Sequence, residues 1–140
     1  MRQYGPTSPR NVPEDRNPST VVGGSSQTAV GGQDLALATY TVPTSRRATL
    51  NCQVGGTVAV AFAAGQTATI TIHVTPSGGA DTIVAGHPFT TATPVNQGFP
   101  LGSATIRLKA GDLVTVRVTL GAGAGNLAAV GGLEGTEYDA

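Results

Sequence analysis

The sequence predicts an all-β fold, a β-sandwich or barrel built from seven or eight short antiparallel strands. Apolar and polar residues alternate with a period of two over much of residues 35–130, which gives each strand one apolar face. Glycine and proline separate the alternating runs, as turns require. No window combines a period of 3.6 residues with helix-capping residues, so no helix is expected.

Residues 1–33 are expected to form an extended N-terminal arm in front of a sandwich domain at 34–140, whose C-terminal end is a short acidic tail. Prolines and glycine pairs interrupt this arm, and its few apolar residues follow no period, so it cannot offset its ordering entropy by itself. Two interpretations stay open, a tail without a role and an arm that orders on a neighbouring subunit, and we favour the second. Its expected contact residues are Tyr4, Arg10, Val12, Arg16, Val21 and Val22.

The alternation is clearest in residues 67–75, where Ala68, Ile70 and Ile72 are expected to face the core while His73 faces outward. Gly55 and Gly56 are expected to form a tight turn, residues 86–102 a long loop, and residues 121–125 a flexible glycine-rich loop. The expected strands are 35–42, 48–54, 58–62, 67–75, 82–85, 104–109, 114–120 and 127–130.

Charge excludes some partners and suggests another kind. The formal net charge is zero, so the chain lacks the surplus of cations that nucleic acid or an anionic membrane would require. Between residues 48 and 106 Asp81 is the only formally charged residue, which favours a surface covered by other subunits over a threonine-rich surface in solvent. The N-terminal residues resemble no signal peptide, and no apolar run approaches the ~20 residues that span a bilayer.

Few residues suggest chemistry, and none predicts a catalytic, cofactor or metal site. His73, Asp81 and His87 match no metal-ligand spacing, and ordinary surface or loop roles are favoured for them. Cys52 is expected inside the core, where burial raises the pKa of a thiol. Asp112 follows a turn glycine, so we expect it to accept hydrogen bonds from nearby backbone N–H groups.

Two other features each allow a simple structural explanation. The glycines at 121–125 precede no helix and no Lys-Ser/Thr pair, so a turn is favoured over a phosphate-binding loop. Arg46 and Arg47 follow the first strand, where they either remain solvated or contact the carboxylates of a partner.

Three segments carry a resemblance to a known family: residues 40–50 (Tyr-Thr-Val-Pro, then Arg-Arg-Ala-Thr-Leu), residues 104–112 (Ala-Thr-Ile-Arg-Leu-Lys-Ala-Gly-Asp) and residues 132–135 (Gly-Leu-Glu-Gly). Together they resemble small jelly-roll proteins of tailed-bacteriophage virions, in particular trimeric capsid decoration (cement) proteins. The strand, Gly-Asp turn and valine-rich strand are also similar to trimeric jelly rolls of the tumour-necrosis-factor type. The resemblance covers residues 35–135.

The resemblance implies a jelly-roll-like sandwich that acts in assembly and not in catalysis, with no cofactor. The implied partners are the major capsid protein, further copies of this chain in a homotrimer, and neighbouring decoration subunits reached by the arm. The implied location is the outside of a virion, after synthesis in the host cytoplasm. The alternative is a fibre or tail-associated module that binds host glycans, which the absence of tryptophan disfavours.

Overall fold

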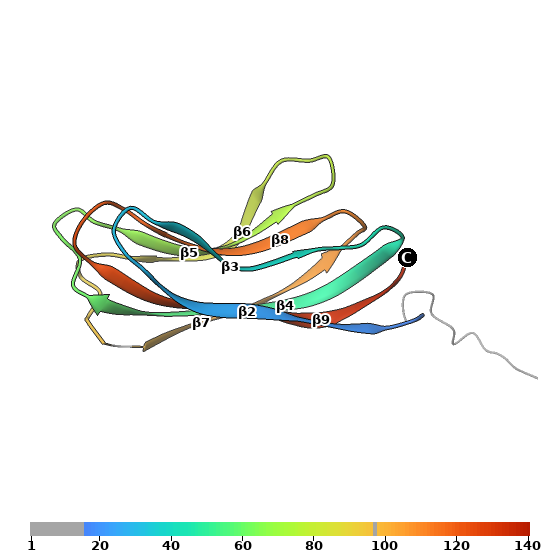
Figure 1. Ribbon diagram of the computed structural model, residues 1–140, viewed down its shortest axis with the longest axis horizontal. Coiled ribbons are helices and arrows are strands. Elements are labelled where there is room, and N and C mark those ends of the chain that lie inside the picture. The colour runs from blue at the N-terminus through green and yellow to red at the C-terminus, as the bar shows by residue number, and fades with distance from the viewer. Residues whose placement is uncertain (1–15, 97) are drawn as a thin grey trace, which may run out of the picture.

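The computed structural model describes residues 16–96 and 98–140, with the backbone alone for 98–103. These residues form eight strands and no helix, in two facing layers (Figure 1). The prediction of an all-β sandwich is therefore confirmed. The strands are β2 (Ser19–Ala29), β3 (Asp34–Thr41), β4 (Arg46–Val60), β5 (Ala68–Thr75), β6 (Thr82–Phe89), β7 (Gly98–Leu108), β8 (Leu113–Leu120) and β9 (Asn126–Asp139).

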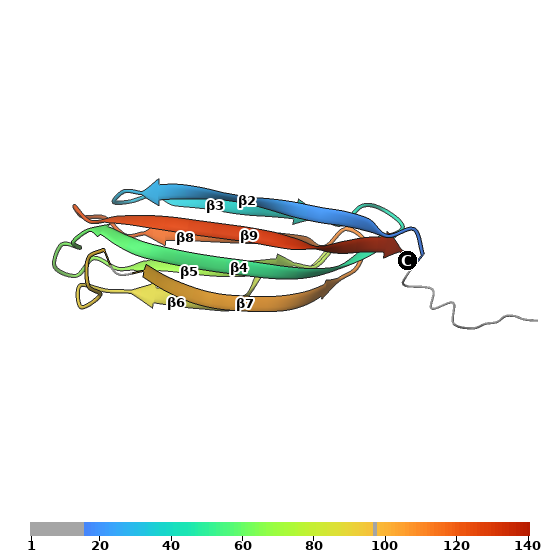
Figure 2. The same cartoon turned by 90° about the horizontal axis from the view of Figure 1, so that it is seen from below.

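Each layer is a four-stranded antiparallel sheet whose neighbours come from both halves of the chain. One sheet has the order β2-β9-β4-β7 and the other has the order β3-β8-β5-β6. This eight-stranded arrangement, in which consecutive strands alternate between the two sheets except for the β5–β6 hairpin, is a jelly roll. Figure 2 shows its two long sides, with β2 and β3 along one and β6 and β7 along the other.

The core forms where the apolar faces of the two sheets meet. On β5, Ala68, Ile70 and Ile72 are buried as the alternation predicts, and Val114, Val116 and Val118 of β8 are buried beside them. Leu50 and Cys52 of β4 enter the core from the opposite sheet. A strand period of two is thus sufficient to place these side chains.

Residues 19–29, which we assigned to the arm, belong to the sandwich. They form β2, which pairs with β9 along its whole length, from Ser19 opposite Glu137 to Ala29 opposite Leu127. As an edge strand, β2 buries only Val21 and Ala29, so its sequence carries no alternation. The boundary at residue 33 was therefore wrong, and residues 1–15 lie outside the described part of the chain. The prediction of an acidic C-terminal tail was also wrong, because the acidic residues lie within β9.

Gly55 and Gly56 do not form the expected turn. They lie within the 15-residue strand β4, and neither has a positive φ angle. A Cβ atom at residue 56 would lie 2.9 Å from Ile70 Cδ1 and 3.1 Å from Phe89 Cζ. Glycine is required here because two core side chains approach the backbone closely.

The expected loop at 86–102 is shorter in the structure, because β6 extends to Phe89 and β7 begins at Gly98. Phe89 is fully buried and anchors the end of β6 in the core. Pro88 is tolerated within this strand because β6 is the edge of its sheet, where a ladder donor can be missing.

The glycine-rich turn at 121–125 is held by one buried side chain, Gln66, which is only 3% exposed. Its Oε1 accepts hydrogen bonds from the N–H groups of Gly125 (2.8 Å) and Ala63 (3.0 Å). Its Nε2 donates to the carbonyl oxygen of Gly121 at 3.0 Å. The amide of Gln66 thus satisfies backbone groups that would otherwise be buried without partners.

Candidate functional site

A cluster of polar side chains closes the end of the sandwich where β3, β4 and β9 meet. The Arg46 guanidinium lies 3.3 Å from Glu137 Oε1 and 2.7 Å from Asp139 Oδ1. The Tyr40 hydroxyl, from the opposite sheet, donates a hydrogen bond to Glu137. Asn17 Nδ2 donates to Asp139 Oδ2 at 2.5 Å. We call these residues the end cluster. It links the two sheets to each other and to Asn17, which lies just before β2.

The end cluster changes the proton affinity of two of its members. Burial raises the pKa of Tyr40 above its ordinary value, and the hydrogen bond to Glu137 adds to the shift. Hydrogen bonds from Asn17 and Arg46 lower the pKa of Asp139. Arg46, for which a solvated role and contact with a partner's carboxylates were both considered, pairs with Glu137 and Asp139 of its own chain. The cluster is suited to stabilising the fold.

A groove of about 390 Å³ lies beside this cluster, on the outer face of the β2-β9-β4-β7 sheet. Its polar side chains come from neighbouring strands, because Arg47 of β4 pairs with Tyr138 of β9 and Thr49 pairs with Arg107 of β7. Odd-numbered residues of β4 and β7 face outward here, opposite the buried Ala48 and Leu108. The full lining is Arg47, Ala48, Thr49, Arg107, Leu108, Lys109 and Tyr138.

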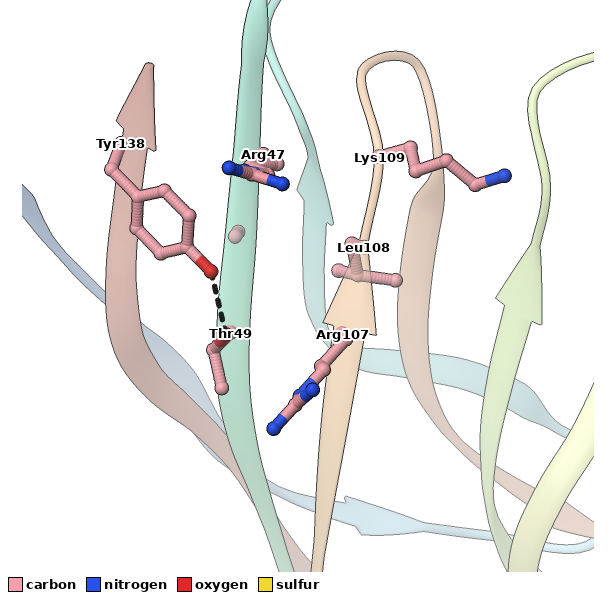
Figure 3. A pocket seen from close by; sticks show the side chains of 7 residues that line it. Arg47, Thr49, Arg107, Leu108, Lys109 and Tyr138 are labelled. Carbon is pink, nitrogen blue, oxygen red and sulfur yellow. Dashed lines mark hydrogen bonds between the residues drawn. The ribbon is translucent and has the colours of Figure 1, made fainter. Parts of the chain in front are cut away.

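We call this the basic groove, because Arg47, Arg107 and Lys109 line it, and Figure 3 shows its side chains. The guanidinium carbon of Arg47 lies 5.4 Å from the centre of the Tyr138 ring, within the range of a cation–π contact. The Tyr138 hydroxyl is 3.1 Å from Thr49 Oγ1, which fixes the ring. Arg107 lies across the groove from Tyr138, and the backbone N–H of Lys109 donates to Asp112 Oδ2 at 2.8 Å.

The outer face of the other sheet carries a hydrogen-bonded row on β5. His73 Nδ1 lies 2.7 Å from Asp81 Oδ2, and His73 Nε2 lies 2.8 Å from Thr71 Oγ1. Thr75 Oγ1 donates to Asp81 Oδ1 at 2.9 Å. The hydrogen bond with His73 lowers the pKa of Asp81, with a smaller contribution from Thr75. The structure therefore pairs His73 with Asp81, two residues whose spacing in the sequence matches no metal-ligand pattern.

Thr71, His73 and Asp81 have the order of hydrogen bonds seen in a hydroxyl–imidazole–carboxylate relay. However, same-face residues two apart on one strand lie side by side in any sheet, so the Thr71–His73 contact follows from strand geometry. β5 also pairs with strands on both sides, and its backbone N–H groups are committed to those ladders. An acyl-transfer site needs free N–H donors for the oxyanion, and this row does not supply them.

The other candidates for chemistry have structural roles. Cys52 is fully buried, and burial raises the pKa of its thiol, as expected for a core residue. Asp112 accepts hydrogen bonds from the N–H groups of Lys109 (2.8 Å) and Ser77 (3.0 Å), which confirms its predicted turn role. His87 packs edge-on against Phe89 with ring centres 5.0 Å apart. Within residues 16–96 and 98–140, no group of three or more His, Cys, Asp or Glu is placed to hold a metal.

The expected contact residues of the arm lie in different environments. Tyr4, Arg10 and Val12 lie outside the described residues. The Arg16 carbonyl oxygen accepts a hydrogen bond from the Asp139 N–H at 2.9 Å. Val21 is buried in the core of its own chain, whereas Val22 is 77% exposed on the outer face of β2.

The sequence places Arg47 beside Arg46 after the first strand, and it does not predict the groove. The alternation in residues 104–109 places Arg107 and Lys109 on the face opposite Ile106 and Leu108, but nothing local shows that β7 lies beside β4. Neighbouring strands in a jelly roll are distant in sequence, so the signal that joins these cations is the strand order itself.

No protein-family model and no curated protein matches the sequence. Among solved structures, the chain is similar to a chain in the structure of the infectious bursal disease virus Gx strain. The identity is 14% and the TM-score 0.49, and the match covers 90% of this chain and 33% of that chain. It is also similar to the VP2 subviral particle of that virus (13% identity, TM-score 0.49, 88% and 33%). A third structure, of Bacillus endospore appendages, has 13% identity and TM-score 0.42, with 96% and 98% covered.

The chain spans about a third of the length of the viral chains. Across its described residues, the structure contains no helix long and apolar enough to cross a membrane.

Proposed function

We propose that this protein is a non-enzymatic structural protein of a bacteriophage virion, which binds the outside of the capsid and stabilises its lattice. The observation that carries the proposal is the distribution of charge over the sandwich. Residues 48–106 contain one formal charge, Asp81, and they supply most of β4 and β7 and all of β5 and β6. We call the part formed by residues 48–106 the β6–β7 side, after the two strands that lie along its edge (Figure 2).

The β6–β7 side also exposes aliphatic side chains. Ile83 is 59% exposed on β6, and Val84 beside it is 47% exposed. Val60 and Val95 are exposed toward the other end of this side. A free monomer usually covers its surface with mixed charges, whereas a surface covered by other subunits needs few. The charge distribution therefore supports assembly with capsid protein and with further copies of this chain, for which we propose a homotrimer.

Residues 1–15 are proposed to act as the arm that reaches neighbouring subunits. They precede Arg16, whose carbonyl oxygen is bonded to Asp139 at the end of β9. Prolines at 6, 9 and 13 favour extended backbone, and Tyr4, Arg10 and Val12 supply side chains for contact. An arm repeated over a lattice turns weak single contacts into strong avidity.

The test compares the full chain with a chain of residues 16–140 for binding to purified capsids. Both proteins should fold alike, because all described strands lie between Ser19 and Asp139. The full chain should bind with a copy number near that of the major capsid protein, and the shorter chain should bind much more weakly. Equal binding by both chains would exclude a role for the arm, and no binding by either would exclude the lattice function.

Copy number also separates this function from glycan binding by a fibre or tail module. Glycan sites usually present exposed aromatic rings as platforms. Among the described aromatic side chains, Phe89 is buried, while Tyr40, Phe62 and Tyr138 are only partly exposed. A few copies per particle would favour the fibre or tail alternative.

A further inference from the structure

Among the described edge strands of the two sheets, β2 alone carries no feature that opposes pairing with a further strand. Natural edge strands bear charges, prolines or bulges, because their outer N–H and C=O groups otherwise offer a template for another chain. β3 carries Asp34 and a register shift. β6 carries Pro88 and a register shift, and β7 carries Pro100 and Arg107. β2 has neither charge nor proline, and its eleven residues pair with β9 without a register shift.

The outer edge of β2 is accessible along the strand. About every second residue of an edge strand directs its N–H and C=O groups away from the sheet. Apart from the β9 ladder, no hydrogen bond between described residues reaches the backbone of Ser19–Ala29. The backbone of β3 differs, because Ser25 Oγ donates to the Leu37 carbonyl at 2.7 Å. Gln27 Nε2 likewise donates to the Ala36 carbonyl at 3.1 Å. The outer groups of β2 therefore match an extended polypeptide strand.

The strand that fits this edge best is β2 of a second copy. Two identical strands can pair antiparallel across a two-fold axis, so that the donors of each meet the acceptors of the other. Because β2 is uncharged, such a pair brings no like charges together. The other three edges carry the features that oppose pairing. Residues 1–15 contain prolines at 6, 9 and 13, which lack backbone donors and suit a strand partner poorly.

The position of β2 suits a contact between neighbouring trimers. β2 runs along the long side of the sandwich opposite β6 and β7 (Figure 2). When the β6–β7 side is covered within the proposed homotrimer, β2 faces outward from it. Two-fold or local two-fold axes relate neighbouring three-fold units of an icosahedral shell, and an isologous pair of β2 strands has this symmetry.

We propose that β2 pairs antiparallel with β2 of a second copy, so that the β2-β9-β4-β7 sheets of two subunits join into one eight-stranded sheet. This inference deepens the proposed function and rests on it, because it names the contact between neighbouring decoration subunits. Full overlap centres the pair on Gly24, the midpoint of the strand, and places Val22 of one copy opposite Ser26 of the other. Both residues are exposed, Val22 by 77%.

The experiment compares the masses of variants in solution by sedimentation equilibrium. A single pair of edges lacks the avidity of a lattice, so each protein is measured over a concentration series up to its solubility limit. The double variant Val22→Lys, Ser26→Lys opposes lysines across the two-fold axis and should block pairing. At the highest concentration the wild type should have at least twice the mass of this variant, whether the blocked unit is a monomer or the proposed trimer.

Charge reversal tests the register of the pair. The variant Val22→Glu, Ser26→Glu should also fail to pair with itself, whereas its equimolar mixture with the lysine variant should recover the wild-type mass, because each lysine then lies opposite a glutamate. The matched control, Thr39→Lys, Thr41→Lys, adds the same charge to exposed positions of β3 on the same long side and should keep the wild-type mass. Circular dichroism checks the fold of every variant.

Two results would overturn the proposal: equal masses for the wild type and the lysine variant, or no recovery of mass in the mixture. Loss of capsid binding by the lysine variant at unchanged mass would assign the edge to a capsid strand and would also reject self-pairing. The proposed function is tested apart from this, by capsid binding of the wild type. A lysine variant that is a folded monomer at all concentrations would reject the homotrimer and leave the β2 pair standing.

Discussion

At the scale of single residues, Gln66 shows how one buried amide can organise a turn. It joins the segment after β4 to the turn between β8 and β9, through two accepted and two donated hydrogen bonds. The sequence does not distinguish this glutamine from exposed ones, because three of its four hydrogen bonds join it to backbone groups 55 and 59 residues away. Such contacts become visible only when the chain is folded.

Gln66→Ala should destabilise the fold by about 2 kcal/mol, because it leaves buried backbone N–H and C=O groups without partners. Chemical denaturation monitored by circular dichroism measures this change in the free energy of unfolding. Gln53→Ala is the matched control, since Gln53 is exposed on β4, and its effect should stay within about 0.5 kcal/mol. Equal losses for both variants would contradict the role assigned to Gln66.

Tyr40 gives a prediction at high pH. Its pKa is raised in the folded state, so the fold favours the neutral phenol. This stabilisation is fully present below the ordinary phenol pKa of about 10 and is lost as the pH rises through the folded-state value. The difference in phenolate absorbance between the wild type and Tyr40→Phe reports Tyr40 alone. It should therefore appear only above pH ~10, and its appearance earlier would contradict the buried contact with Glu137.

At the scale of strands, the bounds of β3 were predicted closely, although an irregularity in its pairing buries the neighbouring residues Leu37 and Ala38. The alternation of apolar residues predicted β5 and β8 closely, because each has one face in the core. It failed where another constraint determined the residues. β2 is an edge strand with two buried apolar residues, and β4 contains Gly56, where core packing leaves no room for a larger side chain. The bounds of β6 and β7 were too short, because proline and glycine lie within strands at the edges of the sheets.

Gly56→Ala tests whether packing, and not turn formation, requires glycine in β4. The new methyl group would lie within 3.1 Å of Ile70 and Phe89 side-chain atoms, and we expect a loss of about 1–3 kcal/mol in the free energy of unfolding. Gly132→Ala in β9 is the matched control, because its Cβ would meet no atom closer than 3.6 Å. Thermal and denaturant unfolding of both variants decide the question, and an unchanged Gly56→Ala protein would refute tight packing.

At the scale of the whole molecule, strand order brings together what sequence analysis could not join. The outward positions of Arg47 and Arg107 follow from alternation, yet their proximity requires β4 and β7 to be neighbours. The same is true of the Tyr40 and Glu137 contact, which crosses between sheets. Individual faces were therefore predictable from local pattern, whereas sites depended on the long-range topology.

The β6–β7 side gives the last prediction, which concerns assembly. If subunits cover this side, a charge placed there must lose its hydration in the assembled state, which is costly without a partner. Ile83→Lys should therefore shift the protein from trimer to monomer in sedimentation velocity at equal concentration, with an unchanged fold. Thr39→Lys on β3, exposed along the opposite side of the sandwich, is the control and should remain trimeric. A wild-type chain that stays monomeric at all concentrations, or equal dissociation of both variants, would show that the low charge of this side does not reflect self-association.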